Sequence, residues 1–307
     1  MGGACCAGTR DKINYGKDRG SEMCGIVQQN MKTRMVNARM GIQSAKKKVK
    51  EKFNVAKLKA RGYTQLYCDV LDESEFEFLT KFEQENFQMC KVTLDSFEKA
   101  LKEFVEKEET KFISKDQIVE SFKTRKYLLE VENEYSLSYG MLTHPIFQKE
   151  PDLIYIPYLQ LVAILYSAST FKMKAVSFYQ MVKVENTNRI PKDDPFLVEY
   201  LRKLLEISYI MALSLYNEFN EDEQNHKDTR EFDFMVEDQD LIFKHIYSEF
   251  IEGLFGRDLK LAEEVFVHRF EREEQKNYLQ PWELRKIINK HRLDIEAQKR
   301  DKINANQ

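Results

Sequence analysis

The chain has 307 residues, 42% of them apolar, with only 11 glycines and 6 prolines, which predicts a predominantly helical protein with a substantial hydrophobic core. No apolar run approaches the length of about eighteen residues that a transmembrane helix needs, which argues against a membrane-spanning segment. The five cysteines form no CxxC pair and show no metal-binding spacing to the five histidines, so we expect a reducing, cytoplasmic environment.

The net charge of −3 hides a strong asymmetry along the chain. Residues 1–62 carry a formal charge of +11 and the remaining residues carry −14. The sequence therefore predicts a basic arm attached to an acidic body. Such an arm favours an anionic partner: lipid headgroups, nucleic acid or an acidic protein polymer.

The arm begins Met-Gly-Gly-Ala-Cys-Cys, which is typical of N-myristoylation at Gly2 and palmitoylation at Cys5 and Cys6. Cys6 stands where that signal prefers serine or threonine. A single myristoyl chain holds a protein only marginally on a membrane, so a second acyl chain or a basic patch has to assist it. Both kinds of second signal are present in this arm.

Apolar residues then recur at helical spacing from Ile42 to Ala56, and Gly62 ends the pattern. The basic residues of this predicted amphipathic helix are the expected anionic-surface ligands: Lys46, Lys47, Lys48, Lys50, Lys52, Lys57, Lys59 and Arg61. The helix fits an anionic membrane, an acidic polymer such as tubulin, or the acidic body of its own chain. Nucleic acid is disfavoured because the arm lacks interleaved aromatic residues.

Residues 72–101 predict two helices around a loop centred on Val92. A competing loop centred on Ile113 follows at once, with Glu106 and Glu108 as oxygen donors. The two are too close for both to be complete helix–loop–helix units. The next loop is predicted around Ile156, before a strongly apolar helix.

A further helix from Phe171 leads into a loop over 183–194, with Ile190 at its eighth position and Glu185 at its third. Lys183 opens this loop and Asp194 is predicted to cap the following helix. After an acidic segment and another helix, the last loop is placed around Leu279.

In that last loop Glu283 stands at the closing position, and a charged helix is predicted over 284–302.

Together, residues 65–292 resemble the four-hand calcium-sensor and calcineurin-B-like family, whose EF-hand loops bind calcium through oxygen ligands. The resemblance implies an all-α fold with two lobes of paired degenerate EF-hands. The predicted divisions are a basic arm, an N-terminal lobe, a C-terminal lobe, an acidic insertion within that lobe, and a charged tail: 1–62, 63–170, 171–292, 217–240 and 293–307.

Most ligand positions of these loops hold lysine, proline or an apolar residue, so no metal site and no cofactor is predicted. The remaining candidates for weak calcium binding are Glu106, Glu108, Glu185, Asp194 and Glu283. Loss of the ligands implies an adaptor that holds partner helices in apolar clefts without a calcium switch. An unrelated helical bundle is the alternative fold.

An enzyme is not expected, because the histidines are scattered and neither a phosphate-binding glycine loop nor a GxSxG motif occurs. Three functions stay open. The first is a membrane-tethered adaptor in the cytoplasm, and the second is a structural component of a cytoskeletal assembly such as a ciliary axoneme. The third is a weak residual calcium sensor.

Overall fold

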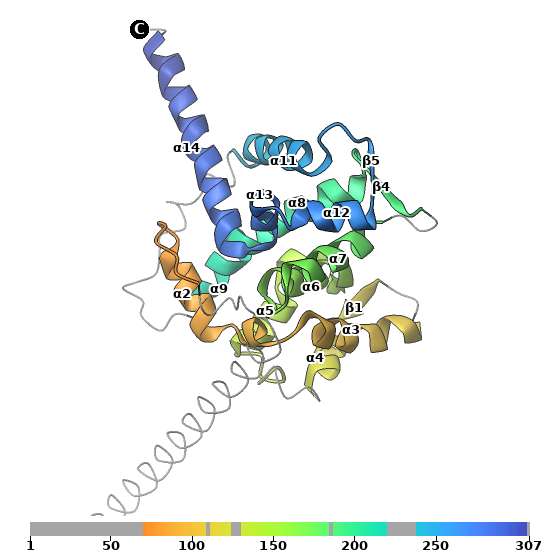
Figure 1. Cartoon of the computed structure of the whole chain (residues 1–307). Coiled ribbons are helices and arrows are strands. Elements are labelled where there is room, and N and C mark those ends of the chain that lie inside the picture. The colour runs from red at the N-terminus through yellow and green to blue at the C-terminus, as the bar shows by residue number, and fades with distance from the viewer. Residues whose placement is uncertain (1–69, 109–110, 124–129, 184–186, 220–237, 306–307) are drawn as a thin grey trace, which may run out of the picture. The chain divides into compact units, whose positions relative to one another are not determined.

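A computed structural model of the chain describes residues 70–108, 111–123, 130–183, 187–219 and 238–305 (Figure 1). This part is mostly helical and contains two small antiparallel sheets. Among the described residues, no helix combines the length and the apolar character needed to cross a membrane. Gly2, Cys5, Cys6 and the basic residues from Lys46 to Arg61 lie outside the described residues, so the predictions for the arm stay predictions.

The elements of the first half follow in chain order: α2 (Glu77–Asn86), η2 (Gln88–Lys91), α3 (Leu94–Glu108), β1 (Phe112–Ser114), α4 (Lys115–Lys123), α5 (Leu137–Thr143), η3 (Pro145–Phe147), β2 (Gln148–Glu150), β3 (Leu153–Tyr155) and α6 (Ile156–Tyr166).

The second half continues with α7 (Phe171–Val182), β4 (Arg189–Pro191), α8 (Pro195–Glu206), the π-helical turn η4 (Ile207–Met211), α9 (Ala212–Phe219), α11 (Gln239–Phe255), β5 (Lys260–Ala262), α12 (Glu263–Phe270), α13 (Glu273–Lys276), η7 (Asn277–Leu279) and α14 (Pro281–Ala305).

In the described part, helix–strand–helix units occur in pairs, and the short strands of the two units in a pair form an antiparallel ladder. β1 runs antiparallel to β3, with Ile113 opposite Ile154, and β2 joins the other edge of β3. β4 runs antiparallel to β5, with Ile190 opposite Leu261. The first pair therefore joins α3–β1–α4 to α5–β3–α6, and the second joins α7–β4–α8 to α11–β5–α12.

Two of the predicted loop centres lie in the paired strands: Ile113, which competed with Val92, and Ile190. The loop centre predicted at Ile156 is wrong by two residues. Ile156 is the first residue of α6, and Ile154 is the residue that pairs with Ile113 in the ladder. Side chains two apart share one face of a strand, so the apolar pattern alone does not separate them.

Two further loop centres are wrong. Val92 follows the 3₁₀ turn η2 in extended conformation but lies in no strand. Leu279 ends the turn η7, whereas the strand that pairs with β4 lies at Leu261. Both predicted centres are apolar residues that are buried for packing rather than for ladder formation.

Local signals explain where several helices begin and end. Asp194 caps α8 as predicted, since its Oδ1 accepts hydrogen bonds from the N–H groups of Phe196 and Leu197. Ser114 and Gln117 form a reciprocal capping box at the start of α4. Gly256, with φ +55°, ends α11 in a backbone conformation that favours glycine.

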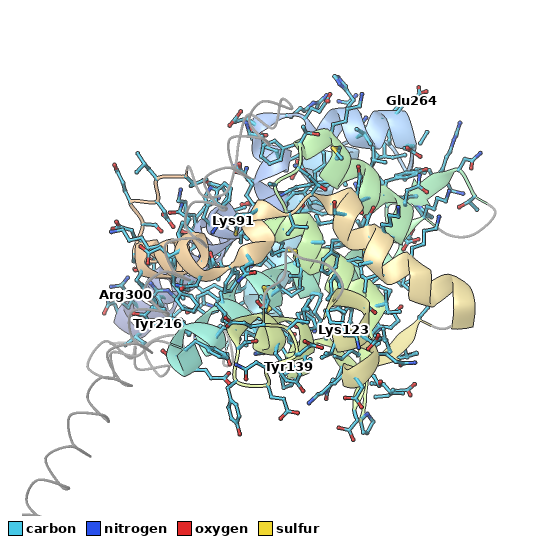
Figure 2. All side chains as sticks on the ribbon, turned by 90° about the horizontal axis from the view of Figure 1, so that it is seen from below. Lys91, Lys123, Tyr139, Tyr216, Glu264 and Arg300 are labelled. Atoms are coloured by element: carbon cyan, nitrogen blue, oxygen red, sulfur yellow. The ribbon has the colours of Figure 1, made fainter. Side chains whose placement is uncertain are left out.

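The described residues share one continuous hydrophobic core that runs through both predicted lobes. α6 lies at its centre and packs against α3, α7 and α8. α7 packs closely on α12 through aromatic pairs such as Tyr179 and Phe266, whose ring centres are 5.3 Å apart. Figure 2 places Lys123 of α4 and Tyr139 of α5 on one side of this body and Glu264 of α12 on another.

A fully buried ion pair ties distant parts of the chain together. Arg285 of α14 donates two hydrogen bonds of 2.8 Å to the carboxylate oxygens of Glu83 in α2. It also donates to the carbonyl of Ser208 in the π-helical turn, and the hydroxyl of Tyr166 in α6 donates to Glu83. Four elements far apart in sequence therefore share one polar network in the core.

The C-terminal helix α14 is continuous across the predicted boundary at residue 293 and extends to Ala305. Its last turns project from the body, and the side chains from Ala297 to Asn304 are exposed (Figure 1).

The acidic segment predicted for 217–240 is shorter than expected at its ends, because α9 includes Asn217 to Phe219 and α11 starts at Gln239.

Candidate functional site

The paired loops are the candidate site, because they are where a calcium-binding helix–loop–helix protein would hold its ion. We number each loop by placing its central ladder residue at position eight. On this numbering the loops start at Glu106, Phe147, Lys183 and Leu254. Ile113, Ile154, Ile190 and Leu261 are the central residues.

Two residues of the first loop accept hydrogen bonds from the protein itself. Gln117 at its twelfth position accepts a hydrogen bond of 2.8 Å from the N–H of Ser114. The carbonyl of Lys111 at the sixth position accepts from the N–H of Ile156 across the ladder. Glu106 and Glu108 fall in the last turn of α3, and their side chains are outside the description.

The second loop holds a lysine against aromatic rings. The Nζ of Lys149, at the third position, lies 4.2 Å from the ring centre of Tyr155 and 5.1 Å from that of Tyr158. It is also 2.5 Å from Oε1 of Glu199 in α8. Asp152, at the sixth position, has φ +60°, so a residue without glycine's freedom makes the sharp turn. A side-chain ammonium thus lies within this loop.

A second lysine reaches the same loop from α8. The Nζ of Lys203 is 4.6 Å from the ring centre of Tyr158 and donates to the carbonyl of Ile146 at 3.1 Å. Tyr158, at the closing position, donates its hydroxyl to Glu199 at 2.9 Å. Burial and the Glu199 carboxylate raise the pKa of the Tyr158 hydroxyl, which therefore remains a donor.

His144 precedes this loop and is held neutral. Its Nδ1 accepts from the N–H of Ile146 at 3.2 Å. Burial, followed by the positive charge of Lys203, lowers the pKa of His144 to about 4. The imidazole therefore acts as a helix-capping acceptor near neutral pH.

In the third loop, the carboxylate at the twelfth position, that of Asp194, caps the helix α8. Asp194 is 2% exposed and accepts from two N–H groups at the start of α8. Lys183, at the first position, follows the last turn of α7. Glu185 lies outside the described residues. A buried carboxylate committed to helix capping leaves little ligand capacity for an ion.

A guanidinium from the helix after the fourth loop contacts three oxygen atoms of that loop. Arg269 of α12 donates hydrogen bonds of 2.7 Å to the carbonyls of Leu254 and Phe255. Its other terminal nitrogen pairs with the carboxylate of Asp258, at the fifth position. Lys192 of the third loop donates to the carbonyl of Gly256 at 3.3 Å. Two side-chain cations therefore bind four oxygen atoms of this loop.

Glu283 is not in a loop, which corrects its predicted place at a closing position. It lies in the first turn of α14 and pairs with Lys286 at 2.9 Å. Among the described residues, no three histidine, cysteine, aspartate or glutamate side chains are arranged to hold a metal ion as they stand.

Sequence reasoning missed the residues that carry this arrangement: Lys149, Lys192, Lys203, Leu261 and Arg269. A lysine inside a loop could have been noted at Lys149. Lys203 and Arg269 lie on helices, and their part in the loops depends on tertiary packing.

Comparison with models of protein families found no match, and comparisons with curated proteins and with solved structures found none either. The function therefore has to be argued from the site itself.

Proposed function

We propose that the described body is a calcium-independent adaptor built from degenerate EF-hand units, and that it has no enzymatic role. The observation that carries the proposal is a cation at ligand positions of two loops: Lys149 stands at the third position of the second loop, and Arg269 pairs with Asp258 at the fifth position of the fourth. A fixed positive charge repels a divalent ion at short range and occupies its ligands.

Helix pairs joined by short ladders support the EF-hand interpretation. In that family, each loop contributes a short strand to its partner loop, and calcium changes the angle between the helices. Here cationic side chains supply positive charge in the second and fourth loops, so we expect the angle between the helices not to respond to calcium. Partner helices are then held by a surface that does not change with calcium.

The basic arm supplies the attachment in this proposal. Gly2, Cys5 and Cys6 carry acyl chains, and the lysines from Lys46 to Lys59 add attraction to an anionic membrane. The acidic surface of tubulin in a cytoskeletal assembly such as an axoneme is the alternative partner. The two partners require different chemistry, since only the membrane requires acylation.

Calcium titration by calorimetry of the full chain tests the body. We expect no binding heat up to millimolar calcium, both with and without magnesium. Micromolar binding, with any stoichiometry, would contradict the adaptor and favour the residual sensor.

Metabolic labelling with a myristate analogue tests the arm, with Gly2→Ala as the matched control. Label on the parent and none on the variant supports membrane attachment. Absence of label, together with co-sedimentation of both proteins with microtubules, would replace the membrane with the cytoskeletal partner.

A further inference from the structure

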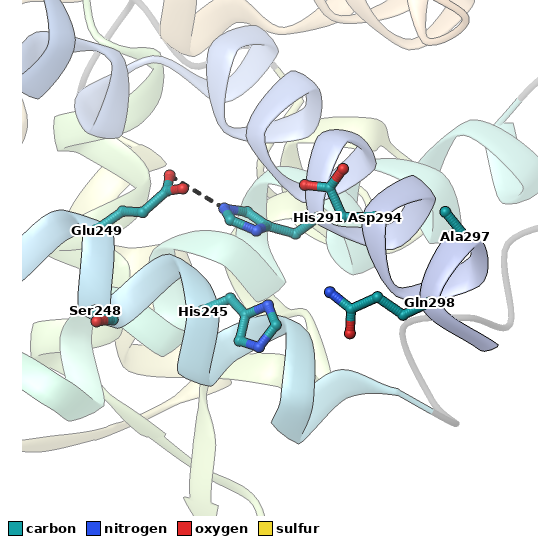
Figure 3. Close-up of a pocket in the computed structure, with 7 residues that line it drawn as sticks. All are labelled: His245, Ser248, Glu249, His291, Asp294, Ala297 and Gln298. Atoms are coloured by element: carbon teal, nitrogen blue, oxygen red, sulfur yellow. Dashed lines mark hydrogen bonds and ion pairs between the residues drawn. The ribbon is translucent and has the colours of Figure 1, made fainter. Parts of the chain in front are cut away.

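A groove between α11 and α14 gathers side chains that neither the loops nor the buried ion pair use. Its volume is about 500 Å³ (Figure 3). Three residues of α11 and four of α14 line it: His245, Ser248, Glu249, His291, Asp294, Ala297 and Gln298. Metal-ligating side chains therefore face one another from two helices that pack together.

Helical spacing sets these residues on the facing sides. His245 and Glu249 are four residues apart on α11, and His291 and Asp294 are three apart on α14, so each pair lies on one helix face. His291 is 4% exposed, and its Nε2 lies 3.2 Å from Oε2 of Glu249. The rings of His245 and His291 have their centres 5.9 Å apart.

These separations are close to those around a tetrahedral zinc ion. With bonds of about 2.0–2.1 Å, neighbouring ligand atoms are about 3.3 Å apart, and the centres of two bound imidazoles are about 5 Å apart. The contact between His291 and Glu249 already matches. The three side chains do not meet at one point in this structure, because the His245 ring lies toward Gln298 (Figure 3). His245 is half-buried, and binding in the proposed site requires a different rotamer that turns its ring toward Glu249.

Lys290 places a positive charge beside Glu249, but its side chain is 61% exposed, so solvent screens that charge more than the charges in the loops. Lys290 contacts Oε1 of Glu249 at 3.2 Å, which leaves Oε2 for another ligand. The carboxylate of Glu249 is half exposed and lines the groove, so this oxygen is accessible to a metal ion.

We propose that His245, Glu249 and His291 form a binding site for a divalent transition metal, with zinc as the probe, that fastens α11 to α14. Two imidazoles and one carboxylate suit zinc rather than calcium, which prefers six or more oxygen ligands. The metal replaces the hydrogen bond between Nε2 of His291 and Oε2 of Glu249, and both atoms become its ligands. The site lies outside the four loops, so it does not depend on the proposed adaptor function.

Zinc calorimetry on the full chain tests the site, together with thermal unfolding in the presence and absence of zinc. Thiols are a second source of zinc binding, so the parent for this experiment carries serine at Cys5, Cys6, Cys24 and Cys68. We expect one zinc per chain and a higher Tm with zinc. His245→Ala, at a half-buried position, should lower the zinc affinity at least tenfold and abolish the rise in Tm.

Two matched controls make the result specific. Ser248→Ala lines the same groove without a metal ligand, and His268→Ala removes an exposed histidine from α12. Both should bind zinc as the parent does. Equal zinc affinity in the parent and in His245→Ala, or no stoichiometric binding by the parent, would overturn the proposal.

Discussion

The second and fourth loops hold a positive charge by different chemistry. In the second loop, the ammonium of Lys149 rests on the ring faces of Tyr155 and Tyr158 and pairs with Glu199. In the fourth, the guanidinium of Arg269 donates to two backbone carbonyls and to Asp258. The ammonium of the second loop is partly exposed and makes contacts without a fixed direction. The guanidinium of the fourth loop makes directional hydrogen bonds.

This difference predicts that the stability of the two loops depends unequally on the cation that each one holds. A guanidinium forms several hydrogen bonds in a fixed plane, and its loss leaves carbonyl oxygens without that donor. An ammonium over a ring makes a softer contact that neighbouring groups replace more easily. The fourth loop should therefore be more sensitive to substitution than the second.

The largest expected effect follows from breaking the buried ion pair between α2 and α14. Arg285→Met leaves Glu83 buried without its ion-pair partner, and we expect a loss of about 3–5 kcal/mol in the free energy of unfolding. Denaturant unfolding measures it. Arg300→Met, an exposed position of the same helix, should change stability by less than about 0.5 kcal/mol. Equal effects of the two changes would show that the buried pair contributes nothing.

The next effect concerns Lys174, which is buried where α7 follows α6. Its Nζ donates to the carbonyl of Leu165 at 2.9 Å, and burial lowers its pKa to about 7. Above that pH the unfolded chain binds a proton that the folded chain does not, up to the ordinary lysine pKa of 10.5. Stability should therefore rise with pH from about 7 to about 10.5, by a few kcal/mol in total.

Unfolding at several pH values tests this dependence. Lys174→Met should flatten it, because methionine does not titrate. Lys172→Met, exposed on the same helix, should keep the parent's pH dependence. A parent stability that falls between pH 7 and pH 10 would contradict the expectation.

The fourth loop comes next. Arg269→Met should cost about 2 kcal/mol, since charge-assisted hydrogen bonds to the loop are lost. Hydrogen–deuterium exchange should increase over residues 254–262 and much less over 147–155. Arg272→Met, an exposed arginine a few residues further on, is the control and should leave both segments unchanged.

The smallest effect is expected at the second loop. Lys149→Met should cost about 1 kcal/mol or less, because its side chain is 31% exposed and its contacts are an ion pair and ring faces. Lys260→Met, on an exposed strand position of the other pair, is the control. A larger loss at Lys149 than at Arg269 would reverse the comparison between the two loops.

The sequence predicted the helical fold because apolar spacing and capping signals are local, and two of the loop centres that it predicted, Ile113 and Ile190, lie in the paired strands. Ile190 stands in a recognisable frame between Lys183 and the Asp194–Pro195 helix start. No such frame surrounds Leu261, because Ala262 and the two glutamates that follow it are typical of a helix interior. A three-residue strand carries little pattern of its own.

The site was less predictable because its contacts join distant parts of the chain. Arg269 and Lys203 look like solvated residues on charged helices, and only folding brings them to the loops. Arg285 likewise reads as a surface residue of α14, yet it is completely buried. No local signal marks which arginine of a charged helix faces the core.

The most direct test of the account is hydrogen–deuterium exchange of the full chain with and without calcium, read over the β1–β3 and β4–β5 ladders. We predict identical protection at every peptide of these ladders in millimolar calcium and in chelator, because side-chain cations already bind the loops. Calcium-dependent protection over either ladder would contradict the account and restore a calcium sensor.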